Sequence, residues 1–231
     1  MSHNITEVTV VPQTGLRHTA TLIFMHGSGW NGVLSKNDLE MVFGQEFSFP
    51  HIRVVYPTSP ERPYTPCSGM LQHVWFDRQA VDISAQEDVS SIKLMAEELN
   101  KLIDKEISLG IDVKRIVIGG FSMGSSMALQ MGYCFRPDVA GIIALSSFLN
   151  QTSNVYKVLE TEPEGERPPL FMCHGDSDKV VPFAWGERTF AQLQQRGVKG
   201  EFHSFPGLNH SLCKREVELM KKWLVDLLPD V

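Results

Sequence analysis

Hydrophobic positions along the chain follow two alternating patterns, short continuous apolar runs and apolar residues at helical spacing. The runs are rich in β-branched residues, which is typical of buried strands in a parallel sheet. They predict strands at residues 7–11, 19–25, 52–56, 115–118, 139–145, 170–173 and 201–205, with the first at a sheet edge. Helical spacing predicts helices after Ser122, near Val155, and over residues 89–110, 183–196 and 212–228. This alternation predicts one α/β domain over residues 1–231, with a mostly parallel central sheet and helices on both faces.

One segment, from Pro57 to about Ser84, interrupts the alternation. It is rich in proline, glycine and serine, and we predict a long loop, which inside a compact domain is usually functional. The run from Ser84 to Glu87 has the spacing of a capping box, which predicts that the next helix begins there. Ligands of parallel α/β sheets bind at the carboxyl ends of the strands, so we expect a functional site at that edge.

The pentapeptide Gly120-Phe121-Ser122-Met123-Gly124 joins a predicted strand to a predicted helix. Its glycines let the backbone bend sharply and let neighbouring elements approach closely. A serine at such a turn is lifted above the sheet, and the next N–H lies at the positive end of the helix. We therefore predict Ser122 as a nucleophile and the Met123 N–H as a donor to an oxyanion.

A serine nucleophile needs a base, and the base needs an acid that fixes its tautomer and stabilises its charge. In hydrolases with this kind of sheet the order along the chain is Ser, then Asp or Glu, then His. His210 follows the strand at 201–205 and precedes the last helix, so we predict it as the general base. Asp176 and Asp178 both follow the strand at 170–173. Either carboxylate fits the acid, and the other would brace its loop through backbone N–H groups.

Two further segments carry candidate residues. The run His26-Gly27-Ser28-Gly29 follows a buried strand, and the Ser28 N–H is the predicted second oxyanion donor. His26 has no partner at metal-ligand spacing, so a structural hydrogen bond within its loop is the favoured role. Trp75 and Phe76 end the long loop, where they could anchor it on the core, wall a substrate-binding groove above the serine, or do both. Neither a phosphate-binding loop, a dinucleotide fingerprint nor zinc spacing occurs, so we predict no cofactor and no metal.

Composition narrows the class of protein. The net charge of −6 without a basic run argues against nucleic acid and against docking on anionic membranes. No apolar stretch approaches the ~20 residues of a membrane span, and the first residues lack the basic and apolar regions of a signal peptide. The four cysteines have no C-x-x-C spacing, which suits reduced thiols, and we expect a cytosolic protein.

Five motifs in one order carry a resemblance to a known family. They are Phe24 to Gly29, Trp75-Phe76-Asp77, Gly119 to Gly124, His174-Gly175-x-x-Asp178-x-x-Val181-Pro182, and Asn209-His210. The chain resembles the acyl-protein thioesterase/lysophospholipase family and looks closest to its lysophospholipase-like branch, over residues from about 11 to 229. The resemblance implies a cytosolic protein with an α/β-hydrolase fold. It also implies the triad Ser122, Asp178 and His210, with Ser28 and Met123 as oxyanion donors. It implies ester and thioester substrates, including S-acyl groups on protein cysteines.

The sequence departs from the family pattern beside the first oxyanion donor. The family usually has an acidic and then a small residue after the His-Gly-Ser-Gly run, whereas this chain has Trp30-Asn31. We expect the Trp30 indole to contact substrate and to reshape the acyl site, and the lysophospholipase-like branch implies short acyl groups. Two other functions stay open, a small-molecule carboxylesterase without a dedicated protein substrate and a weakly active hydrolase fold that binds acyl groups or a partner. We expect a monomer or a weak dimer.

Overall fold

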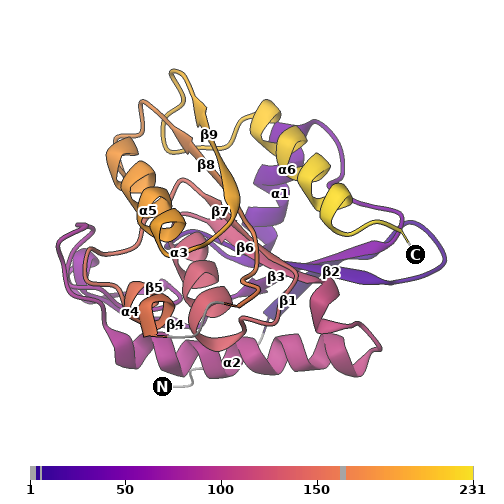
Figure 1. Cartoon of the computed structure of the whole chain (residues 1–231), viewed down its shortest axis with the longest axis horizontal. Coiled ribbons are helices and arrows are strands. Elements are labelled where there is room, and N and C mark those ends of the chain that lie inside the picture. The colour runs from indigo at the N-terminus through magenta and orange to yellow at the C-terminus, as the bar shows by residue number, and fades with distance from the viewer. Residues whose placement is uncertain (1–3, 6, 162–164, 231) are drawn as a thin grey trace.

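A central seven-stranded sheet dominates the computed structural model, which describes residues 4–5, 7–161 and 165–230 (Figure 1). The strand order is β1-β3-β2-β6-β7-β8-β9, and within it only the β1–β3 pair is antiparallel. The strands are β1 (Glu7–Val11), β2 (Ala20–Met25), β3 (Ile52–Thr58), β6 (Ile116–Phe121), β7 (Gly141–Leu145), β8 (Leu170–Gly175) and β9 (Gly200–Phe205). This arrangement confirms the predicted mostly parallel sheet with β1 at an edge.

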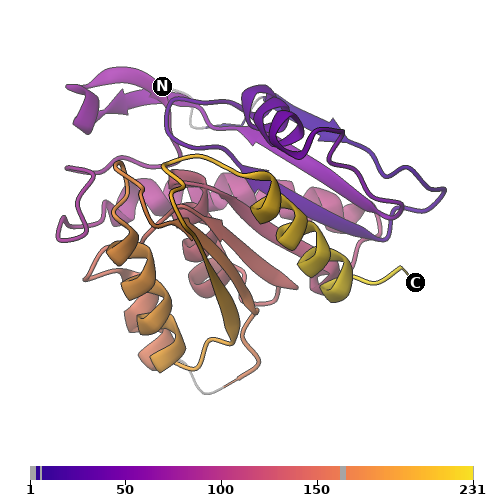
Figure 2. The ribbon, with the colours of Figure 1, turned by 90° about the horizontal axis from the view of Figure 1, so that it is seen from above.

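Helices cover both faces of the sheet, as the sequence predicts. They are α1 (Gly32–Phe43), α2 (Val89–Ser108), α3 (Met123–Gln130), α4 (Asn154–Thr161), α5 (Phe183–Gln195) and α6 (Lys214–Leu227). Alternate side chains of β2 point to opposite faces, so that Leu22 and Phe24 join one buried cluster with α1 and α6. Ile23 and Met25 join the other, with α2, α3, α4 and α5. In Figure 1, α1 and α6 lie above the sheet and α2 runs below it, and Figure 2 shows the same layers from above.

The segment predicted as one long loop contains regular structure, so that prediction is wrong in part. Strand β3 continues to Thr58, and β4 (Glu61–Tyr64) pairs antiparallel with β5 (Met70–His73) through the turn η1 (Thr65–Cys67). This hairpin forms a separate sheet beside the central one (Figure 2). The hydrophobic pattern hides β4 because one of its two buried side chains is a charged arginine, Arg62.

Two helix starts differ from the prediction. Helix α2 begins after Asp88, whose side chain accepts the Ser91 N–H, so the predicted capping box at residues 84–87 is wrong. Helix α1 was not predicted, because its apolar face is short. Its ends nevertheless carry ordinary signals, since the Asn31 side chain caps its first turn and Gly44, at φ 85°, ends it.

Candidate active site

Ser122 occupies the sharp turn between β6 and α3, near the middle of the sheet. Its backbone has φ 54° and ψ −118°, a conformation that costs energy for a residue with a side chain. The turn also packs tightly against the end of β2. A Cβ atom added to Gly120 or Gly124 would lie 2.4 or 2.2 Å from the Met25 carbonyl oxygen. Both positions therefore require glycine. This explains why a glycine stands two residues before and two residues after Ser122.

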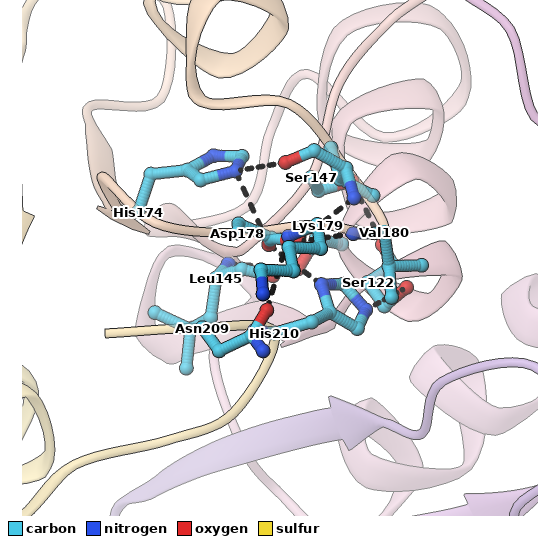
Figure 3. Close-up of polar contacts among 11 residues, drawn as sticks. Ser122, Leu145, Ser147, His174, Asp178, Lys179, Val180, Asn209 and His210 are labelled. Carbon is cyan, nitrogen blue, oxygen red and sulfur yellow. Dashed lines mark hydrogen bonds and ion pairs between the residues drawn. The ribbon is translucent and has the colours of Figure 1, made fainter. Parts of the chain in front are cut away.

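Three side chains from three strand ends form one hydrogen-bonded chain (Figure 3). His210, on the loop between β9 and α6, lies with its Nε2 3.0 Å from the Ser122 Oγ. Its Nδ1 lies 2.7 Å from Oδ2 of Asp178, on the loop between β8 and α5. The ring of His210 also packs on Phe121, with the ring centres 4.9 Å apart. The hydroxyl, imidazole and carboxylate thus lie in the order that proton transfer to the imidazole requires.

The environment of Asp178 favours a permanently ionised carboxylate. Burial alone raises its pKa, but hydrogen bonds from His174, His210 and the Val181 N–H outweigh burial and hold the pKa well below its usual range. Oδ1 accepts the backbone N–H groups of Val180 and Val181, each at 2.8 Å. The His174 ring lies 3.4 Å from Oδ2 and donates from Nε2 to the Val181 carbonyl at 2.9 Å. The sequence places His174 in a family motif but does not indicate this role beside the acid.

Geometry separates the two candidate carboxylates. Oδ1 of Asp176 accepts the Gly207 N–H at 2.7 Å and the hydroxyl of Ser177 at 3.0 Å, and Asp176 is exposed. The Asn209 side chain accepts the Lys179 N–H at 3.0 Å, which adds a second tie between the same loops (Figure 3). Asp176 therefore braces the loop that carries Asp178 against the loop that carries His210.

A cavity of about 440 Å³ opens above Ser122. Ser28, Met123 and Trp30 line it together with Ser122 and His210. Met123 is the first residue of α3, so its N–H has no acceptor within the helix. The Ser28 hydroxyl lies 3.6 Å from the Met123 sulfur, which brings the two predicted oxyanion residues together.

His26 holds the loop that carries Ser28. The imidazole is buried, donates from Nδ1 to the Gly27 carbonyl at 2.7 Å, and accepts the Ser59 N–H at Nε2 at 3.0 Å. Burial lowers the pKa of His26 to about 4, so the ring is neutral at pH 7. This is the structural role that the sequence favoured. Within the described parts of the chain, no three His, Cys, Asp or Glu side chains are grouped as a metal site would need.

The sequence profile of the phospholipase/carboxylesterase family matches residues 6–228. The chain belongs to this family. It is 47% identical over 222 residues to mouse (Mus musculus) lysophospholipase-like protein 1. The aligned region covers 95% of this chain and 91% of the mouse protein. It is 36% identical to acyl-protein thioesterase 1 of Neurospora crassa, over 93% of this chain and 89% of that protein.

Solved structures agree with this membership of the phospholipase/carboxylesterase family. The crystal structure of Zea mays acyl-protein thioesterase 2 superimposes with a TM-score of 0.85 at 28% identity, over 96% of this chain and 99% of that chain. The α/β-hydrolase fold that the sequence motifs imply is thereby confirmed. In the described residues, no helix is both long enough and apolar enough to cross a bilayer.

The predicted substrate-binding aromatics lie in two different places. Trp30 is 38% exposed and lines the cavity, and its contact with substrate stays a prediction. Trp75 is fully buried, donates from Nε1 to the His26 carbonyl at 2.8 Å, and does not belong to the described cavity wall, nor does the buried Phe76. The prediction that these two residues wall the groove is corrected here, because the structure places them beneath the loop as anchors.

Several wall residues of this family member escaped the sequence analysis. They come from the segment between β3 and α2, from α3, from the turn after β7 and from the acid loop, and they are Tyr64, Pro66, Cys67, Arg78, Val81, Ser126, Ser147, Phe148 and Val180. Their types are ordinary for a folded chain, so no sequence signal separates them from core or surface residues. These wall residues can be identified only from the folded structure, which shows which segments surround the cavity.

Proposed function

We propose that the protein hydrolyses carboxylic esters and thioesters through an acyl-enzyme on Ser122. The observation that carries this proposal is the contact chain from Ser122 through His210 to Asp178, at the wall of a cavity. Membership of the phospholipase/carboxylesterase family and similarity to acyl-protein thioesterases support the same chemistry.

The reaction would proceed in two steps. Nε2 of His210 takes the Ser122 proton while the oxygen attacks the acyl carbonyl, and the resulting imidazolium then protonates the departing alcohol or thiolate. In the second step His210 activates a water that attacks the acyl-enzyme. Because the carboxylate of Asp178 stays ionised, it holds the Nδ1 proton and stabilises the imidazolium in both steps.

The tetrahedral intermediates carry a negative oxygen that must be stabilised. We assign this task to the backbone N–H groups of Ser28 and Met123, which border the cavity beside Ser122. The start of α3 adds the positive end of a helix dipole. Each such donor contributes about 3 kcal/mol in comparable sites.

The substrates we propose are acyl esters and thioesters, among them S-acyl groups on protein cysteines. The support is the similarity of this chain to two acyl-protein thioesterases. We further propose that the protein acts in the cytosol, where its free cysteines would stay reduced, as a monomer or weak dimer.

Replacement of the nucleophile tests the proposal. We expect Ser122→Ala to abolish turnover of an acyl thioester and labelling by a fluorophosphonate, because no other hydroxyl lies within 3.0 Å of the His210 Nε2 among the described residues. Circular dichroism and the melting temperature should show an intact fold. A variant that still hydrolyses the thioester at the original rate would refute the assignment.

The same assays separate the alternative functions. The second candidate is a carboxylesterase for short acyl groups, and the observation that favours it is the Trp30 indole in the cavity wall. A series of p-nitrophenyl esters of graded length, compared with an S-palmitoyl peptide, discriminates the two. A protein that only binds acyl groups would turn over neither.

A further inference from the structure

Arg78 places a buried positive charge in the wall of the catalytic cavity. Only 8% of the residue is exposed, and it shares the cavity wall with Ser122 and His210. The guanidinium lies over two aromatic rings, 4.9 Å from the centre of Phe76 and 5.4 Å from the centre of Phe148. These cation–π contacts stabilise the charge, but they supply no hydrogen-bond acceptor for the guanidinium N–H groups of Arg78.

Those donors have no partner among the described residues. The Arg78 guanidinium makes neither a hydrogen bond nor an ion pair within the described chain, and its buried Nε is unpaired. The neighbouring carboxylates are engaged elsewhere, since Glu87 accepts from the Gln130 side chain at 2.8 Å and Asp77 accepts from the Thr65 hydroxyl at 2.6 Å. Glu87 and Asp77 lie near enough to favour the charge of Arg78, but neither accepts its guanidinium N–H groups. A buried cation whose donors are unbonded is costly and is rarely retained without a partner.

The cavity also lacks a competing negative charge. Among the described residues of its wall there is no Asp or Glu, and Arg78 is the one Lys or Arg. Burial lowers the pKa of Arg78, but a guanidinium remains protonated in proteins. Arg78 therefore places a positive charge in a cavity whose other wall residues are mostly apolar or carry hydroxyl groups. The protein as a whole has a net charge of −6.

We propose that Arg78 binds an anionic oxygen group of the substrate, a carboxylate or a phosphate, within the cavity and close to the scissile ester. The planar fork of a guanidinium matches such a group in a two-point contact. The anion has two possible sources, the far end of the acyl chain or the leaving group. Arg78 thereby selects acidic esters and thioesters over neutral ones of the same size. This inference rests on the hydrolase function proposed above.

The experiment compares three thioesters. The first carries an adipoyl group with a free carboxylate, the second its methyl ester, which is neutral and nearly the same size, and the third a neutral acyl group on a thiol that bears a phosphate. For the wild type we expect kcat/KM to be about tenfold or more higher for an anionic substrate than for the neutral one, as for a hydrogen bond to a charged group. A preference for the adipoyl thioester would place the anion at the far end of the acyl chain. A preference for the thioester of the phosphate-bearing thiol would place it on the leaving group.

Substitution assigns the preference to Arg78. Arg78→Met keeps an apolar stem of similar length and should lower the ratio of kcat/KM for anionic to neutral substrate to one or below. Arg62→Met is the matched control, because Arg62 is also buried, 7% exposed, with unpaired guanidinium nitrogens, but lies outside the described cavity wall. It should leave the ratio unchanged. Free adipate should likewise inhibit the wild type at least tenfold more strongly than adipamide, which is neutral and of similar size, and this measurement needs no variant.

The possible failures are distinct. A wild type that hydrolyses all three thioesters equally would overturn the role of Arg78 and leave the proposed function intact. A preference that survives in the Arg78→Met variant would do the same. A wild type that hydrolyses none of the three would instead count against the proposed function itself.

Discussion

The substitution Asp178→Asn tests the reasoning about the acid most directly, because the structure fixes how the new amide must sit. Oδ1 of Asp178 accepts the N–H groups of Val180 and Val181. In the variant only the amide oxygen can accept these two donors, so the amide nitrogen is forced toward His210. Nδ1 of His210 then faces a donor and must accept, which moves the ring proton to Nε2, opposite the Ser122 hydroxyl.

This change of tautomer removes the general base without removing any side chain from the site. An imidazole that carries its proton on Nε2 cannot accept the Ser122 proton, and a neutral amide no longer stabilises the imidazolium. In a serine protease the equivalent substitution lowers kcat about 10⁴-fold, which corresponds to roughly 5.5 kcal/mol of transition-state stabilisation. We expect a loss of the same order here, because the 2.7 Å contact with Nδ1 has the same geometry.

The assay is kcat/KM for an acyl thioester, with the fold checked by circular dichroism. Asp176→Asn is the matched control, since Asp176 contacts Gly207 and Ser177 but not His210, and we expect it to lose less than about tenfold. The reasoning would be refuted if Asp178→Asn kept activity within tenfold of the wild type. It would also be refuted if Asp176→Asn proved the more damaging of the two.

Three further predictions concern stability and the shape of the site. Burial raises the pKa of Glu216 to about 8 from 4.5, so between these pH values the folded state holds a proton that the unfolded state releases. The free energy of unfolding of the wild type should therefore fall by up to about 5 kcal/mol between pH 4.5 and pH 8. Urea titrations should show that Glu216→Gln removes this fall. Gly124→Ala should lower the free energy of unfolding by about 2–3 kcal/mol, because its Cβ would meet the Met25 carbonyl at 2.2 Å; an unchanged melting temperature would contradict this. Trp30→Ala should shift the preferred acyl length upward, measured with graded p-nitrophenyl esters, and an unchanged profile would exclude the indole as a limit on chain length.

Much of the candidate site could be predicted from sequence because its residues directly follow strands. Ser122 directly follows β6 and His210 lies on the loop after β9, and parallel strands bring their carboxyl ends to one edge. The choice between Asp176 and Asp178 could not be made from spacing, since two carboxylates two residues apart on one loop differ only in the direction of their side chains. Hydrogen bonds supplied that direction.

Three buried side chains could not be placed from the sequence, and each is aromatic or charged. Trp75 lies beneath its loop because its indole N–H finds a buried carbonyl at His26, and no pattern of apolar positions encodes that partner. Arg62 and Arg78 are buried where charge usually signals solvent. Arg78 also packs on Phe148, which comes from a distant segment, and a contact of that kind leaves no sign in the local sequence.

The hairpin of β4 and β5 stands apart from the seven-stranded sheet, yet the segment around it supplies much of the cavity wall. If the proposed function is right, the loops that carry the triad cleave the bond, whereas this segment contributes to substrate choice. Changes in the segment from Tyr64 to Val81 can retune which acyl compounds enter while the proton relay keeps its distances. In protein engineering, substitutions intended to change substrate specificity should be made in this segment. The loops after β8 and β9, which carry Asp178 and His210, should be left unchanged.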